Sequence, residues 1–144
     1  MDQVDRAIIE SLKANARAPY GDIGAEVGLS ASAVKRRIDK LVEDGTIRGF
    51  TILLDPAAEG RSTEAYVELF CRGNVTPDNL RRMLTAVPEV VGAVTVTGEA
   101  DALAHIRSAD MPSLERALER VRHTAMVDHT RSAIVLSRLI DRGA

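Results

Sequence analysis

A short basic segment after a tight glycine turn constrains the fold of this 144-residue chain more than any other feature. The segment runs from Leu29 to Leu41 and repeats apolar residues at helical spacing, which predicts an amphipathic helix. Ser30 can cap the start of that helix by accepting a hydrogen bond from a free backbone N–H. The apolar stripe expected to face a core consists of Val34, Ile38, Leu41 and Val42.

The other face of this helix is polar and basic, because Ser32, Arg36 and Lys40 point away from the apolar stripe. A shorter helix precedes it, and Gly28 separates the two. Two short helices joined by a glycine turn, the second one basic, are typical of a helix-turn-helix whose second helix enters the DNA major groove. The residues expected to contact double-stranded DNA are Ser30, Ser32, Lys35, Arg36, Arg37 and Lys40. Arg37 has an alternative role, in which it lies along the edge of the core and pairs with an Asp or a Glu.

Net charge alone does not indicate a nucleic-acid binder. The chain carries a net charge of −2, and its first fifty residues hold eight basic and eight acidic side chains. Many basic helix faces are simply solvated, so the prediction depends on the combination of turn, cap and spacing. A neutral DNA-binding half implies modest affinity per subunit, which several linked copies would raise.

Composition excludes several other classes of protein. Cys71 is the single cysteine, so no internal disulfide can form, and three scattered histidines make a structural zinc site unfavourable. No apolar run is long enough to span a membrane, and the N-terminus lacks the pattern of a signal peptide. We therefore expect a cytoplasmic protein with no metal, no cofactor and no membrane partner.

The N-terminal half is predicted to hold three helices, a strand and a linker. Asp2 can cap the first helix, Pro19 and Gly21 open the second, and Gly45 ends the third. A run rich in β-branched and apolar residues at 46–54 predicts a strand. The expected divisions are a helix-turn-helix domain at 1–50, a strand and linker at 51–62, and a second domain at 63–144.

The second half alternates strands and helices in the order βαββαβ, which is typical of the ferredoxin-like fold. The strands are expected at 64–72, 90–97, 102–107 and 127–140, and the helices begin at Thr76 and Asp110. The whole chain is therefore predicted to be α+β. In the first strand Val67 and Leu69 share one face, whereas Tyr66 and Phe70 lie on the other. Because helices cover only one face of such a sheet, we expect the other face to pack on a second copy.

These residues together resemble the Lrp/AsnC family of transcriptional regulators, also called feast/famine regulators, over nearly the whole chain. The resemblance in the first half lies in Val27-Gly28-Leu29-Ser30, Arg36-Arg37-Ile38 and Leu54-Asp55-Pro56. In the second half it lies in Pro88-Glu89-Val90, Thr97-Gly98-Glu99-Ala100-Asp101 and Thr130-x-Ser132-x-Ile134-Val135-Leu136. Each piece is weak alone, but together they keep the order and spacing of the family.

The resemblance implies a DNA-binding regulator that responds to an amino acid or a related small molecule. It implies homodimers that assemble further, often to octamers, with effector sites between dimers. The effector-binding residues that it implies are Thr97, Gly98, Glu99, Ala100, Asp101, Met126, Thr130 and Ser132. Ala100 and Met126 stand where the family often has a bulky residue and a glycine, so the pocket is reshaped. Met126 favours a hydrophobic or sulfur-containing effector side chain.

The chemistry of this turn suits a zwitterion. Free N–H groups at a glycine turn can hold a carboxylate, and Asp101 can hold an ammonium group. Asp101 could equally be a simple turn residue.

No catalytic residues are expected. Gly92, Gly98 and Gly143 are isolated rather than part of a phosphate-binding loop, and the histidines lack metal-ligand spacing. Two alternatives stay open at this point. One is an enzyme like the sirohaem decarboxylases, which resemble the same family, and the other is a ligand-sensing module that does not bind DNA.

Overall fold

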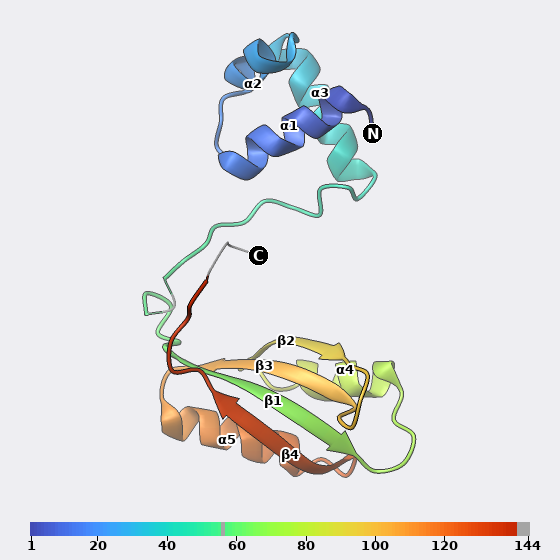
Figure 1. The fold of residues 1–144 in the computed structure, drawn as a ribbon, viewed down its shortest axis with the longest axis vertical. Coiled ribbons are helices and arrows are strands. Elements are labelled where there is room, and N and C mark those ends of the chain that lie inside the picture. The colour runs from blue at the N-terminus through green and yellow to red at the C-terminus, as the bar shows by residue number, and fades with distance from the viewer. Residues whose placement is uncertain (56, 141–144) are drawn as a thin grey trace. The chain divides into compact units, whose positions relative to one another are not determined.

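The computed structural model describes residues 1–55 and 57–140. The chain divides into two compact units, Met1–Ile52 and Leu53–Ala144 (Figure 1). Each unit has its own hydrophobic core, and each is described by itself below.

The N-terminal unit consists of the three predicted helices, α1 (Gln3–Ala14), α2 (Tyr20–Val27) and α3 (Ala31–Glu43). Their apolar stripes meet in one small core that buries Ile8, Leu12, Ile23, Val34 and Ile38. Leu41 is buried as expected, but the prediction for Val42 is wrong because 43% of its surface is exposed. Val42 follows Leu41 by one residue, and this turns its side chain about 100° away from the buried stripe.

The turn between α2 and α3 depends on two glycines. Gly28 ends α2 in the left-handed conformation with φ of 71°, which residues with a side chain adopt rarely. A Cβ atom at Gly24 would collide with the backbone carbonyl oxygen of Leu29. Gly24 therefore lets the turn approach α2 closely, and this fixes where α3 begins.

The segment at 46–54 is not a strand in the single chain, so that prediction is wrong here. Ile47 packs against the helical core, but Phe50, Ile52, Leu53 and Leu54 are each more than half exposed. The described sheet contains only four strands, all from later in the chain, and none of them pairs with this segment. A strand needs a neighbour for its backbone hydrogen bonds, whatever its intrinsic propensity.

The C-terminal unit has the predicted βαββαβ order. Its elements are β1 (Thr63–Cys71), α4 (Pro77–Thr85), β2 (Val90–Thr95), β3 (Ala102–Ser108), α5 (Met111–Arg122) and β4 (Val127–Ile134). The four strands form one antiparallel sheet in the order β2-β3-β1-β4 (Figure 1). Buried residues of α4 and α5 cluster with Ala65, Val67 and Leu69, so both helices cover the same face.

The last strand is shorter than predicted, because β4 ends at Ile134 rather than at residue 140. Ile134 pairs with Ala65, and the backbone N–H of Val135 still bonds to Glu64. Because the two strands are antiparallel and β1 begins at Thr63, residues after Val135 have no further residues of β1 to pair with.

The helix-free face of the sheet carries apolar and aromatic side chains, as the alternation in β1 predicts. Tyr66 stacks on His105 with ring centroids 4.7 Å apart, and Phe70 stacks on His129 at 4.3 Å. Val94 of β2 is 58% exposed and pairs across the sheet with Leu103.

Candidate functional site

The outer face of α3 presents a polar and basic surface. Ser32, Lys35, Arg36 and Lys40 are all exposed there. Lys35 donates to Asp39 at 2.6 Å one turn later, and this bond raises the pKa of the Lys35 ammonium group. Three of the residues predicted to contact DNA, Ser32, Arg36 and Lys40, therefore lie on one face of α3 with no described ion-pair partner.

Arg37 lies at the edge of this face and holds α1 against α3. Its Nη1 atom donates to Asp2 at 2.8 Å and to Asp5 at 2.7 Å. The two carboxylates raise the pKa of the guanidinium group. Asp2 caps α1, and its pKa is lowered mainly by the hydrogen bond from the backbone N–H of Asp5 and next by the hydrogen bond from Arg37. This pairing is the alternative role expected for Arg37, and it ties α3 to the start of α1.

Ser30 acts as the predicted cap of α3. Its hydroxyl accepts from the backbone N–H of Ala33 at 3.3 Å and lies 3.1 Å from the hydroxyl of Ser32. The cap fixes the first turn of α3, where Ser32 is exposed.

The turn at 96–101 joins β2 to β3 at one end of the sheet. Gly98 has φ of 116°, which favours glycine, and Thr97 and Glu99 beside it are exposed. Ala100 is buried, with 8% of its surface exposed. Among the predicted residues of this turn, only Ala100 is buried, and Thr97, Gly98, Glu99 and Asp101 are exposed.

Asp101 ties this turn to the end of β1. Its Oδ2 atom accepts from the backbone N–H of Cys71 at 2.7 Å, and its own N–H donates to Leu69 at 2.9 Å. Burial raises the pKa of the Cys71 thiol, and the nearby Asp101 charge raises it further. The thiol is therefore kept protonated, and one oxygen of Asp101 has a structural partner.

The remaining predicted effector residues lie on or next to β4. Thr130 is half-buried, Ser132 is exposed, and Met126 packs against the edge of the hydrophobic core. The Thr130 hydroxyl accepts from Nε of Arg122 at 2.8 Å. Sequence reasoning missed Arg122, because nothing in the sequence indicates that the end of α5 meets the fourth residue of β4.

The sheet register relates these residues to one another. Leu69 pairs with Ala102 on one side and with Thr130 on the other. Asp101 and Thr130 therefore lie at the same end of the sheet, with β1 between them.

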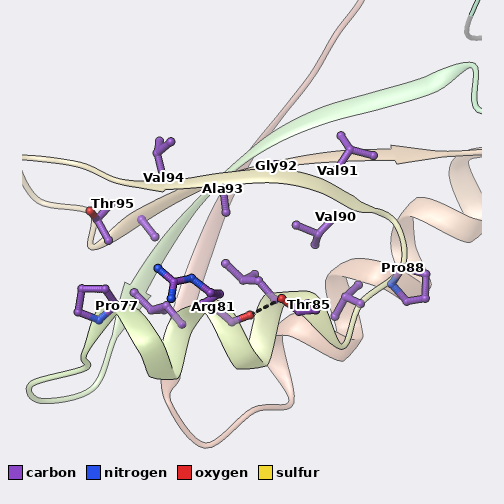
Figure 2. Close-up of a pocket in the computed structure, with 14 residues that line it drawn as sticks. Pro77, Arg81, Thr85, Pro88, Val90, Val91, Gly92, Ala93, Val94 and Thr95 are labelled. Atoms are coloured by element: carbon purple, nitrogen blue, oxygen red, sulfur yellow. Dashed lines mark hydrogen bonds between the residues drawn. The ribbon is translucent and has the colours of Figure 1, made fainter. Parts of the chain in front are cut away.

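A groove of the C-terminal unit lies elsewhere, between α4 and β2, with a volume of about 510 Å³. Figure 2 shows Val90 and Ala93 directed toward α4 and Val94 directed away from it. None of the predicted effector residues lines this groove.

The sequence also did not indicate a charged cluster around Glu64. Burial opposes ionisation of this carboxyl, yet hydrogen bonds from Arg138 and His105 outweigh burial and lower its pKa. Arg138 donates to both carboxylate oxygens at 2.6 and 2.7 Å, and Arg107 lies 3.6 Å away. The cluster anchors β3 and the segment after β4 to the start of β1.

Two kinds of feature are absent from the part of the chain that the structure describes. Residues 1–55 and 57–140 contain no group of three or more His, Cys, Asp or Glu that could hold a metal ion. None of their helices is both long enough and apolar enough to cross a membrane.

Comparison with known proteins identifies both units. Residues 1–42 match the AsnC-type helix-turn-helix domain, and residues 64–144 match the Lrp/AsnC ligand binding domain. The HTH-type transcriptional regulator Rv2324 of Mycobacterium tuberculosis is 50% identical over 142 residues, which cover 99% of this chain and 96% of the relative.

Solved structures show the same fold. The feast or famine regulatory protein Rv3291c from M. tuberculosis, complexed with L-methionine, superposes with a TM-score of 0.88 at 32% identity, covering 97% of this chain and 95% of that one. E. coli AsnC superposes with a TM-score of 0.90 over 100% of this chain and 97% of that one, and at 23% identity this shows the fold alone. The chain therefore belongs to the Lrp/AsnC family of HTH-type transcriptional regulators, and it joins a DNA-binding helix-turn-helix to a ligand-binding domain.

Proposed function

We propose that the exposed face of α3 recognises an operator, with Ser32 and Arg36 at base edges and Lys35 and Lys40 at phosphates. The observation that carries this proposal is the exposure of these side chains on one helix face, next to a capped N-terminus. Arg can bind guanine through two hydrogen bonds, whereas Lys suits a phosphate as a point charge. Arg37, which pairs with Asp2 and Asp5, holds α3 in place and contributes to phosphate binding only secondarily.

Quantitative DNA binding of single variants tests this assignment. Arg36→Ala is expected to cost about 1–3 kcal/mol and to relax preference at one base position. Lys40→Ala is expected to weaken all sequences equally and to lower the slope of log affinity against log salt by about one. Lys13→Ala is the matched control, because Lys13 is an exposed lysine of α1 that pairs with Glu10. A folded Arg36→Ala/Lys40→Ala variant that binds like the wild type would show that another surface reads DNA.

We propose further that the C-terminal unit binds an amino acid at the turn 96–101, with hydroxyls from Thr130 and Ser132. Support comes from the match to the ligand binding domain and from the L-methionine held by a 32% identical relative. Asp101→Asn keeps an acceptor for the Cys71 N–H but removes the charge that would hold an ammonium group. A thermal-shift screen of the twenty amino acids finds the effector, because binding to the folded state raises the melting temperature. Unchanged calorimetric affinity in Asp101→Asn would remove this carboxylate from the site.

The assembly and the absence of catalysis belong to the same proposal. Dimers form through the helix-free face and assemble further, up to octamers, in the cytoplasm. Light scattering that gives the mass of one subunit at micromolar concentration would contradict the assembly. The relatives are named as transcriptional regulators, which favours regulation over catalysis. An absorbance spectrum after addition of haem or sirohaem tests the enzymatic alternative, and a bound-tetrapyrrole band would favour it.

A further inference from the structure

Arg122 occupies an unusual position for an exposed arginine. It is the last residue of α5, and its Nε atom donates to the hydroxyl of Thr130 on β4 at 2.8 Å. This bond orients the guanidinium plane and leaves the two Nη groups outside the contact. Thr130, by accepting from Arg122, keeps its own O–H free to donate.

Neighbouring arginines of the same region are paired with carboxylates. Arg120 pairs with Glu89, Arg131 with Glu68, and Arg72 with Asp128. Within residues 1–55 and 57–140, Arg122 has no carboxylate inside ion-pair distance. Its charge is therefore balanced by no described acid, whereas Arg72, Arg120 and Arg131 each have one.

We propose that Arg122, held by Thr130, binds the carboxylate of the amino-acid effector. A guanidinium whose Nε edge is occupied still offers two parallel N–H donors, and these match the two oxygens of a carboxylate. The Thr130 O–H adds a third donor to the same place. The ligand class is thus a molecule with a free carboxylate, and this inference rests on the proposed effector function.

Arg122 and Asp101 lie at the same end of the sheet, on opposite sides of β1. Thr130 pairs with Leu69 on one side of β1, and Asp101 bonds to Leu69 and Cys71 on the other. A cation for the carboxylate and an anion for the ammonium group are therefore presented at the same end of the sheet. From the sequence, only the backbone N–H groups of the turn were expected to bind the effector carboxylate. Arg122 therefore adds a residue to the site.

The test compares amino acids with their carboxamides. Calorimetry measures wild-type affinity for L-methionine and L-methioninamide, and for the strongest binder among the twenty amino acids with its own carboxamide. We expect the wild type to prefer the carboxylate form, and Arg122→Met to weaken binding of that form by about tenfold to a hundredfold. The variant is then expected to bind the carboxylate and the carboxamide equally, and Arg122→Lys to recover part of the preference.

Arg116→Met is the matched control. Arg116 lies on the same helix and donates to a hydroxyl, that of Ser113, at 2.9 Å, but it is two turns from the end of α5. Its replacement is expected to leave affinity unchanged. Thr130→Val, which removes the hydroxyl, is expected to weaken the carboxylate form in the same direction as Arg122→Met.

The outcomes separate this inference from the function on which it rests. If Arg122→Met melts like the wild type and binds the amino acid with unchanged affinity, the proposed role of Arg122 is overturned and the effector function stands. Equal wild-type affinity for carboxylate and carboxamide overturns it as well. No wild-type binding of any of the twenty amino acids overturns the proposed effector function, and the role of Arg122 with it.

Discussion

Replacement of Ile8 by alanine should unfold the DNA-binding unit and spare the other one. Ile8 is fully buried, with 0% of its surface exposed, in a core formed by only five buried residues. Truncation of a buried isoleucine to alanine costs about 2–5 kcal/mol. A unit the size of Met1–Ile52 has a total stability of roughly 3–8 kcal/mol at the usual free energy per residue. The substitution therefore removes most of the stability of that unit.

Scanning calorimetry and DNA binding together check this prediction. We expect two melting transitions, with the one of the N-terminal unit lowered by more than about 8 °C in Ile8→Ala and operator binding lost at 37 °C. The amino-acid response of the other transition should persist. Ile9→Ala is the control, because Ile9 is only half-buried and its truncation leaves a smaller cavity. A single transition that shifts as a whole, or wild-type operator binding by Ile8→Ala, would refute the idea of two separately stabilised units.

Three further predictions concern the pairings and faces seen in the structure. Arg37→Met should lower the melting temperature of the N-terminal unit but change the salt slope of DNA binding less than Lys40→Ala does, because Arg37 pairs with Asp2 and Asp5. The folded state lowers the pKa of Asp2, so Asp2 stabilises this unit above its ordinary pKa of 3.8 and progressively less as the pH falls below that value. Urea unfolding between pH 2 and 6 should show a weaker pH dependence in Asp2→Asn, which keeps the cap, and an identical dependence would contradict this cause. Val94→Arg places a charge on the helix-free face and should lower the mass measured by light scattering, whereas Val91→Thr should not.

Most of the helices could be predicted because their signals are local. Asp2, Ser30, Thr76 and Asp110 each accept from the backbone N–H three residues later, and this cap needs no information from the rest of the chain. The apolar spacing of three and four residues then fixed the buried faces. The one wrong core residue, Val42, lies beside the correct stripe and shows that a list of apolar residues is broader than a buried face.

The errors and omissions concern what distant residues do to one another. Residues 46–54 have the composition of a strand, but the single chain offers them no neighbour, and β4 ends where β1 can no longer pair with it. The bonds from Arg37 to Asp2 and from Arg122 to Thr130 join side chains of different elements. Periodicity assigns a residue to a face, but it does not reveal its partner. The DNA-contacting and effector residues therefore stay predictions on which the variants above decide.

The surface of the single chain supports assembly independently of any relative. Leu136 and Leu139 are 97% and 91% exposed after β4, and Ile52 and Leu53 are 74% and 71% exposed. Large apolar side chains that are exposed to this extent favour contact with a partner. The two sheet edges also differ, because β4 carries Asp128, His129 and Arg131 whereas β2 carries no charged residue. Charges protect an edge strand against pairing with another chain, so β2 is the edge open to a partner. If the effector also contacts two copies, its binding must stabilise the assembly that completes its site. By reciprocity, formation of that assembly must raise the affinity for the effector by the same free energy.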